Sequence, residues 1–312
     1  MNVACTASSK STIAWYLPPT LPIWYYFNFI FCLSSGSYFH IISLNLDIAV
    51  GMDTHQTLEF HKDWLLISPA ILESANLFLS IITQAPETSA SWLVNHLVEN
   101  ALQGTSSLGH NLTRIPNRAE VFYISFMHSQ DFYVTNCKKN GMDLLAAKNF
   151  HFVDCFSELF LKLIPNPSSA DGSVDDLFSD IKKKISAVSG PVVVFLEAPE
   201  FLLSSTTIST NFLLAQIAKI NKVVQEVIVV VNPVPEYQIV DVDDPAFKAT
   251  DFLNKLYYKS FLNVSLSPLP TGRAKDITGR LAITRGIIQS DVVEREYVYL
   301  LSKEGSIRLM YR

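Results

Sequence analysis

The chain has 312 residues, of which 49% are hydrophobic and 17% charged, and its formal net charge is -5. This composition excludes a disordered, collagen-like or disulfide-rich protein, and the acidic excess excludes one that coats nucleic acid through net charge alone. The length suits one large domain, or one domain with an appendage. No C-x-x-C pair or ligand-spaced His occurs near the four cysteines, so we expect free thiols of a reducing compartment at Cys5, Cys32, Cys137 and Cys155.

Residues 1–51 differ from the rest of the chain. They contain one base, Lys10, and one acid, Asp47, and the apolar run at residues 21–33 is interrupted by Pro22 and Asn28. A membrane-spanning helix needs about 20 such residues, so this run is too short. Two interpretations stay open. The segment is either a non-native or disordered extension ahead of a true start at Met52, or it holds a targeting or membrane signal at residues 13–33.

From residue 52 to 312 we expect a single domain, which begins with alternating strands and helices. Apolar runs predict strands at residues 75–82, 119–126, 150–155, 191–196 and 227–231. The last two lack polar alternation, so both faces of their sheet should be covered. Apolar spacing predicts helices at residues 91–102, 175–188 and 211–220, the first ended by Gly104. This order predicts an α/β protein with a largely parallel sheet flanked by helices.

After residue 233 the pattern changes to short strands. They are predicted at residues 257–266, 280–285, 296–301 and 306–311, with turns at 268–272 and 304–305. We therefore expect an antiparallel C-terminal extension of the parallel sheet. Residues 103–118 and 163–173 are polar and are predicted to be loops.

A ligand site in such a sheet lies at the carboxyl ends of its strands. The first strand-to-helix turn, residues 83–91, has the sequence TQAPETSAS, without Gly or Lys, and Pro86 lacks an N–H group. A phosphate-binding loop needs glycines, so that successive N–H groups face the phosphates, and a Lys to neutralise them. The turn is therefore not a phosphate-binding loop of the usual kind, and we expect no bound cofactor.

Two acids follow the strand at residues 191–196. Glu197 ends the strand, and Glu200 comes three residues later. In a nucleotide hydrolase an acid at this position holds a water bound to Mg²⁺. Without a phosphate loop opposite, we interpret Glu197 as a carboxylate that caps a turn or contacts a neighbour. The alternative is a divergent nucleotide hydrolase that uses Glu197 with an unfamiliar phosphate site.

Other polar residues give no catalytic pattern. His128 and Asp131 follow the strand at 119–126, and Ser204 and Ser205 follow Glu200, so a Ser/His/Asp triad could be assembled from them in principle. However, no G-x-S-x-G elbow exposes a serine, and the seven histidines form no helical metal pair. We predict no catalytic residue and no metal site.

Basic residues gather towards the C-terminus. Residues 255–312 hold ten bases and five acids, although the whole chain is acidic. Within TGRAKDITGRLAITR, residues 271–285, Asp276 is the sole acid among four bases: Arg273, Lys275, Arg280 and Arg285. We predict a hairpin here, with turns at Gly272 and Gly279. It suits contact with phosphates or with a carboxylate surface of a neighbouring subunit, and a simple solvated hairpin explains it equally well.

The C-terminal sequence resembles a known family. YYKSFLNVSLSPLPTGRAKDITGRL, VVEREYVYL and LMYR, all within residues 257–312, resemble the C-terminal part of the Elongator complex protein 6 family, most closely its fungal members. FLEAPEFLLS at residues 195–204, FYISFMHSQDFY at 122–133 and the segment 76–102 also resemble that family's layout. The resemblance covers residues 52–312 and nothing upstream, which favours Met52 as the start.

The resemblance implies a RecA-like fold that lacks nucleotide-binding motifs. It also implies a non-catalytic subunit of a hetero-hexameric accessory ring, built with the sibling Elongator subunits four and five and joined to the larger catalytic subunits. That ring binds tRNA and supports modification of wobble uridine, in the cytoplasm and nucleus and without a membrane. The family's ring is associated with ATP at subunit interfaces, to which this chain would contribute in trans.

Overall fold

The computed structural model describes residues 30–35, 38–43, 56–63, 65–75, 77–109, 113–139, 141–159, 161, 170–234, 241, 244–272, 274–302 and 305–311. The chain divides into two units, Met1–Met52 and Asp53–Arg312. In the first unit β1 (Ile30–Ser35) pairs antiparallel with β2 (Tyr38–Ser43). Lys10, Asp47, Met52 and most of the proposed signal at 13–33 lie outside the described residues. Among the helices described, none has the length and apolar character to cross a membrane.

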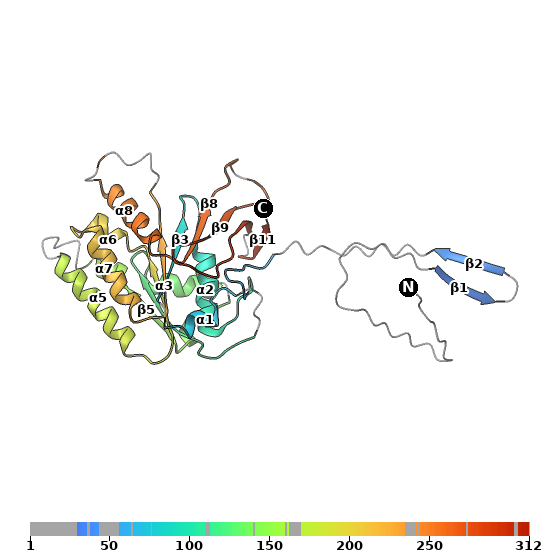
Figure 1. Cartoon of the computed structure of the whole chain (residues 1–312), viewed down its shortest axis with the longest axis horizontal. Helices are drawn as coiled ribbons and strands as arrows, with labels where there is room; N and C mark the ends of the chain where they lie inside the picture. The colour runs from blue at the N-terminus through green and yellow to red at the C-terminus, as the bar shows by residue number, and fades with distance from the viewer. Residues whose placement is uncertain are drawn as a thin grey trace. The chain divides into compact units, whose positions relative to one another are not determined.

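The second unit is built on a nine-stranded sheet (Figure 1) with the order β11-β10-β9-β8-β3-β7-β6-β4-β5. Six neighbouring strands pair parallel. They are β3 (Phe78–Gln84), β4 (Glu120–Ser125), β5 (Phe150–Asp154), β6 (Val192–Glu197), β7 (Glu226–Val231) and β8 (Leu262–Ser267). The remaining three extend the sheet antiparallel from β8. They are β9 (Gly279–Arg285), β10 (Arg295–Leu301) and β11 (Ile307–Tyr311).

Helices cover both faces of the parallel part (Figure 1). On one face lie α1 (Pro69–Leu72), α2 (Ser91–Gln103) and α3 (Gln130–Lys139), with the short η1 (Leu144–Ala146). The other face carries α4 (Cys155–Glu158), α5 (Ala170–Ser186), α6 (Phe201–Ser205), α7 (Thr210–Asn221) and α8 (Pro245–Tyr257).

Strand β6 is apolar throughout because both of its faces are buried. Val193 and Phe195 pack into the core beside α2 and α3, whereas Val194 and Leu196 pack into the core beside α5 and α7. Both faces are buried, as the sequence predicted for a parallel sheet flanked by helices. The strand order and the two helical layers confirm the α/β class, with a largely parallel sheet flanked by helices and an antiparallel C-terminal extension.

The extension packs on one face only. In β9 the residues Leu281 and Ile283 are buried, whereas Arg280 and Ala282 beside them are half-buried. This alternation is typical of an antiparallel sheet with one solvated face. Trp92 of α2 packs against Tyr299 of β10, with ring centroids 5.1 Å apart, so the extension is joined to the same core as α2.

Several element boundaries differ from the prediction. The strand predicted at 257–266 begins at Leu262, because α8 continues to Tyr257. The helix predicted from 175 begins at Ala170, five residues earlier. Gly279, expected in a turn, begins β9. Gly104, with φ 77°, ends α2 in the left-handed conformation expected of a C-terminal glycine.

Candidate functional site

The turn between β3 and α2, where a phosphate loop would lie, is held by hydrogen bonds within the chain. The N–H of Ala90 donates to Oε1 of Gln84 at 2.6 Å, and the N–H of Ser91 donates to the hydroxyl of Ser89 at 3.3 Å. The N–H of Thr88 donates to the carbonyl of Ala85 at 3.0 Å. These backbone donors are therefore already used and do not form a cradle for an anion.

The same turn is linked across the carboxyl edge of the sheet. Nε2 of Gln84 donates to Oδ1 of Asn232, which follows β7, at 2.7 Å. Both the backbone N–H and the side-chain amide of Asn232 donate to Oε1 of Glu200 at 2.9 Å. A continuous series of hydrogen bonds thus runs from α2 through the ends of β3 and β7 to the turn after β6. In a nucleotide-binding protein of this class the ligand lies at this edge.

Glu200 is a buried carboxylate in this series. Burial is the main cause that raises its pKa to about 7, and the hydrogen bonds from Asn232 oppose that shift. Its second oxygen, Oε2, has no hydrogen-bond partner among the described residues. Loss of its proton therefore costs folding free energy, since the ionised form is poorly solvated.

Glu197 contacts neighbouring side chains from β4 and the segment after it. The hydroxyl of Ser125 donates to Oε2 at 2.6 Å, and Nδ1 of His128 lies 3.1 Å from Oε1. The His128 ring stacks on Phe132, with centroids 4.3 Å apart. The geometry is that of a strand-end carboxylate engaged by its neighbours, as we interpreted it from the sequence.

The structure does not assemble the hypothetical triad. The hydroxyls of Ser204 and Ser205 both donate to the carbonyl of Phe201, within their own short helix α6. His128 instead contacts Glu197. Within the described part of the chain, no group of three His, Cys, Asp or Glu is arranged to hold a metal ion. Cys137 and Cys155 are buried free thiols, as predicted for those two positions.

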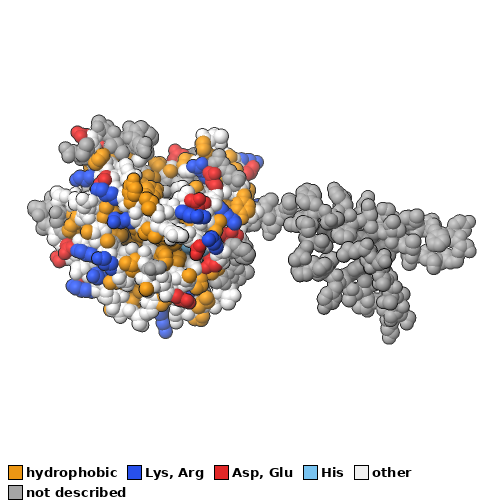
Figure 2. Space-filling view, viewed as in Figure 1, with side chains coloured by type: hydrophobic (Ala, Val, Ile, Leu, Met, Phe, Trp, Pro, Cys, Tyr) orange, Lys and Arg blue, Asp and Glu red, His pale blue; other side chains and the backbone are white. Residues whose placement is uncertain are grey.

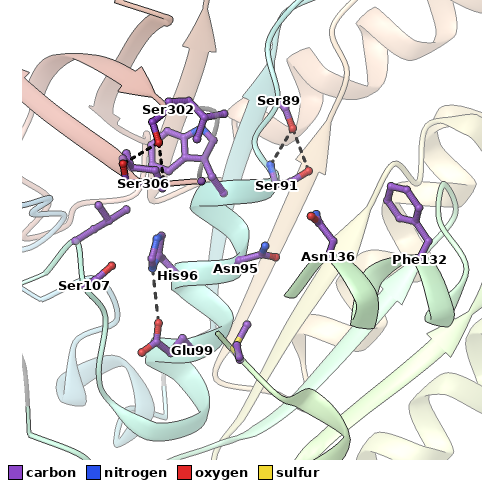
Figure 3. Close-up of a pocket in the computed structure, with 16 residues that line it drawn as sticks. Ser89, Ser91, Asn95, His96, Glu99, Ser107, Phe132, Asn136, Ser302 and Ser306 are labelled. Atoms are coloured by element: carbon purple, nitrogen blue, oxygen red, sulfur yellow. Dashed lines mark hydrogen bonds and ion pairs between the residues drawn. The ribbon is translucent and has the colours of Figure 1, made fainter. Parts of the chain in front are cut away.

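A groove of about 770 Å³ lies beside the amino end of α2 (Figure 3). Asn95 and His96 of α2 lie on one side, Phe132 and Asn136 of α3 on the other, and the turn between β10 and β11 contributes Ser302 and Ser306 at the upper end of the view. Among the described residues that line it there is no Lys or Arg, the side chains that bind phosphate most strongly.

Some polar groups of the groove contact other residues, although Nδ2 of Asn95 and Nδ1 of His96 have no hydrogen-bond partner among the described residues. Nδ1 of His96 lies 3.6 Å from Oε2 of Glu99, and the thiol of Cys137 donates to Oδ1 of Asn95 at 3.4 Å. The two serines at the end of the groove, Ser302 and Ser306, bond to each other at 2.8 Å. None of the three contacts pairs a hydroxyl or thiol with a histidine, as a Ser–His or Cys–His nucleophile would require.

The three described bases of the predicted hairpin lie in different surroundings. Arg273 lies outside the described residues, and Lys275 is exposed in the segment before β9. Arg280 forms an ion pair with Glu296 of β10 at 2.9 Å and donates to Ser267 of β8.

Arg285, at the other end of β9, donates through Nε to the carbonyl of Val292 at 2.9 Å. Arg280 and Arg285 lie five positions apart in one strand and therefore project to opposite faces. On the face of the molecule seen in Figure 2, basic side chains are scattered among acidic and apolar ones and do not form a block.

Sequence reasoning missed Gln84 and Asn232. Both lie at the carboxyl ends of strands, since Gln84 is the last residue of β3 and Asn232 is the first residue after β7. Carboxyl strand ends are where a ligand site is expected, and this rule, which singled out Glu197, applies equally to these two amides. Their pairing could not be predicted without knowing that β3 and β7 are neighbours.

Comparison with known proteins identifies two curated relatives. The chain is 30% identical over 287 residues to Elongator complex protein 6 of Saccharomyces cerevisiae, with 84% of this chain and 100% of the yeast protein covered. It is 24% identical over 241 residues to the Elongator complex protein 6 homolog of Schizosaccharomyces pombe, covering 73% of this chain and 89% of that protein. No protein-family model matches the chain.

Among solved structures, a KaiC-like protein from the archaeon Pyrococcus horikoshii is similar with a TM-score of 0.47 and 9% identity. The match covers 74% of this chain and 88% of that protein. The fold assignment rests on the strand order and the flanking helices.

Proposed function

The chain belongs to the Elongator complex protein 6 family, and from this premise we propose that it is a non-catalytic, RecA-like subunit of Elongator. Its partners are the sibling subunits four and five, with which it forms a hetero-hexameric accessory ring. The ring joins the larger catalytic subunits, binds tRNA and supports modification of wobble uridine, in the cytoplasm and nucleus.

The hydrogen-bonded turn at residues 84–91 carries the non-catalytic part of this proposal. Oε1 of Gln84 accepts from the N–H of Ala90, and Nε2 of Gln84 donates to Asn232. A side chain of the protein therefore occupies the backbone donor that a nucleotide phosphate would otherwise contact. Glu197 is likewise engaged by Ser125 and His128. Such a subunit contributes contact surfaces to the ring. Any ATP at a ring interface is held mainly by the sibling subunits.

Co-expression of the chain with subunits four and five tests the assembly. We expect a stable complex whose mass corresponds to a hexamer of the three chains. A chain that remains monomeric beside its siblings contradicts the proposal. For tRNA binding, charge reversal at Arg273, Lys275 and Arg280 together should weaken binding by the complex across a salt series. Unchanged assembly and unchanged tRNA affinity would show that these residues contribute to neither.

The non-catalytic proposal has a separate test on the isolated chain. A ligand that binds only the folded state raises the melting temperature. Because we expect the isolated chain not to bind nucleotide, ATP with Mg²⁺ should leave its melting temperature unchanged. A rise that is abolished by Glu197→Gln would instead support the nucleotide hydrolase alternative.

A further inference from the structure

Apolar side chains face solvent where the ends of α7 and α8 meet the bend after β9. Tyr258 is 73% exposed, Ile287 65%, Ile288 45% and Leu77 43%. Single exposed apolar residues are ordinary, but a contiguous group of them is typical of an interaction site.

Three hollows connect these residues into one surface. Their volumes are about 420 Å³ between α7 and α8, about 240 Å³ beside Leu77, and about 780 Å³ against β8 and β9. The first two share Leu214, Ala218 and Lys259, and the first and third share Tyr258. We call this the α7–α8 surface, defined by Leu77, Leu214, Ala218, Tyr258, Ile287 and Ile288.

The described residues that line the three hollows are positively charged overall. They include four cations, Lys222, Lys255, Lys259 and Arg285, and no carboxylate, although Glu294 accepts from the backbone N–H of Arg285 at 3.0 Å. Lys255 is paired with Asp251 of its own helix at 2.6 Å, whereas Lys222 and Lys259 are exposed. A binding partner that matches this surface therefore carries carboxylates around an apolar centre.

The exposed isoleucines are held in place by the backbone. The N–H of Gly286 donates to the carbonyl of Phe261 at 2.9 Å, and the N–H of Ile288 donates to the carbonyl of Ser260 at 3.2 Å. A Cβ at position 286 would lie 1.9 Å from the carbonyl oxygen of Ser260, so only glycine allows this close approach. A surface ordered before binding loses less entropy when a partner docks.

We propose that the α7–α8 surface binds a protein segment in which apolar side chains are flanked by carboxylates, and, resting on the function proposed above, that a sibling ring subunit supplies this segment. Nucleic acid is a poor match, because the aliphatic side chains of Leu77, Ile287 and Ile288 offer nothing to phosphates. A lipid surface is the remaining alternative, and the vesicle experiment below tests it.

The test uses the chain co-expressed with subunits four and five. In the variant Lys222→Glu with Lys259→Glu, we expect at least tenfold lower recovery of sibling subunits than with the unmutated chain. The control, Lys183→Glu with Lys184→Glu, reverses two exposed lysines of α5 outside this surface and should leave recovery unchanged. A photo-reactive benzoyl-phenylalanine at position 258 should cross-link to a sibling segment that contains Asp or Glu.

The outcomes separate this inference from the proposed function. If the unmutated chain recovers no sibling, both the ring proposal and this assignment fail. If it recovers siblings and the Lys222/Lys259 variant recovers them equally well, the inference fails alone. Cross-links between two copies of this chain overturn it too. So does binding of the isolated chain to phosphatidylserine vesicles that the variant loses, which would assign the surface to lipid.

Discussion

Gln84 and Asn232, at the carboxyl ends of the adjacent strands β3 and β7, are joined by a hydrogen bond of 2.7 Å from Nε2 to Oδ1. The other end of the Gln84 amide accepts from the N–H of Ala90. One side chain therefore fixes the turn before α2 to the neighbouring strand. In this protein a glutamine stabilises the position where related architectures place a ligand.

Replacement of Gln84 with Ala should destabilise the protein by about 1–3 kcal/mol, because a backbone donor and an amide acceptor both lose their partner. Urea denaturation followed by circular dichroism measures the change. Ser91→Ala is the matched control in the same turn. It removes only an exposed contact with Ser89, so its cost should be below about 0.5 kcal/mol. Equal stability of the two variants would contradict a structural role for Gln84.

Glu200 should make stability depend on pH. Its pKa is raised to about 7 from 4.5, mainly by burial. The stability that its protonated form contributes is fully present below about pH 4.5 and is lost as pH rises through about 7. We expect Glu200→Gln, which cannot ionise and still accepts from Asn232, to raise the free energy of unfolding by about 1–3 kcal/mol at pH 8 and to give no such gain at pH 5.

The comparison is the difference between variant and unmutated chain at each pH. Glu226, whose pKa is also raised to about 7 by burial, titrates in both proteins and cancels in this difference. Asp180→Asn, which removes one member of an exposed pair with Lys183, serves as the control and should show no trend. Parallel stability curves for Glu200→Gln and the unmutated chain from pH 5 to 8 would disprove the assignment.

The strands of the central sheet could be predicted from the sequence because each is a short, distinct apolar run. In β6 and β7 uninterrupted apolar residues indicate burial on both faces, and the structure confirms it. Helix α8 was missed although Asp244 caps it and Pro245 occupies its first turn. Those start signals are present in the sequence, but no element is predicted over residues 244–256, and Tyr257, the last residue of the helix, falls in the strand predicted at 257–266.

The site was less predictable because its residues meet through topology. That residues 83–91 lack a phosphate loop follows from composition alone. The Gln84–Asn232 pair depends on β3 lying beside β7, 148 residues away in the chain. Likewise Arg280 and Glu296 belong to adjacent strands whose register sets their ion pair, so charge counts along the chain overstated the free positive charge of this hairpin.

Gly286→Ala should cost about 3 kcal/mol of stability. The added methyl group would lie 1.9 Å from the carbonyl oxygen and 2.3 Å from the carbonyl carbon of Ser260, and backbone atoms cannot rotate away as a side chain can. Gly172→Ala is a useful control because its Cβ meets nothing within 4 Å. It lies in α5, where alanine should stabilise by about 0.5–1 kcal/mol. Thermal denaturation of both variants measures the contrast, and a Gly286→Ala protein as stable as the unmutated chain would refute the close packing.

Under the proposed function, Lys275 should contribute more to tRNA binding than Arg280 among the C-terminal bases. Lys275 is exposed, whereas Arg280 is already paired with Glu296 at 2.9 Å. A cation that contacts phosphate releases a counterion, so its loss should reduce the slope of log affinity against log salt by about 0.7–0.9. We expect that reduction for Lys275→Ala, a smaller one for Arg280→Ala, and none for Lys183→Ala on α5. Fluorescence anisotropy of labelled tRNA across a salt series measures the slopes. If Lys275→Ala behaves like Lys183→Ala, the lysine before β9 does not contact tRNA, and the excess of bases in this region serves solvation or a neighbouring subunit instead.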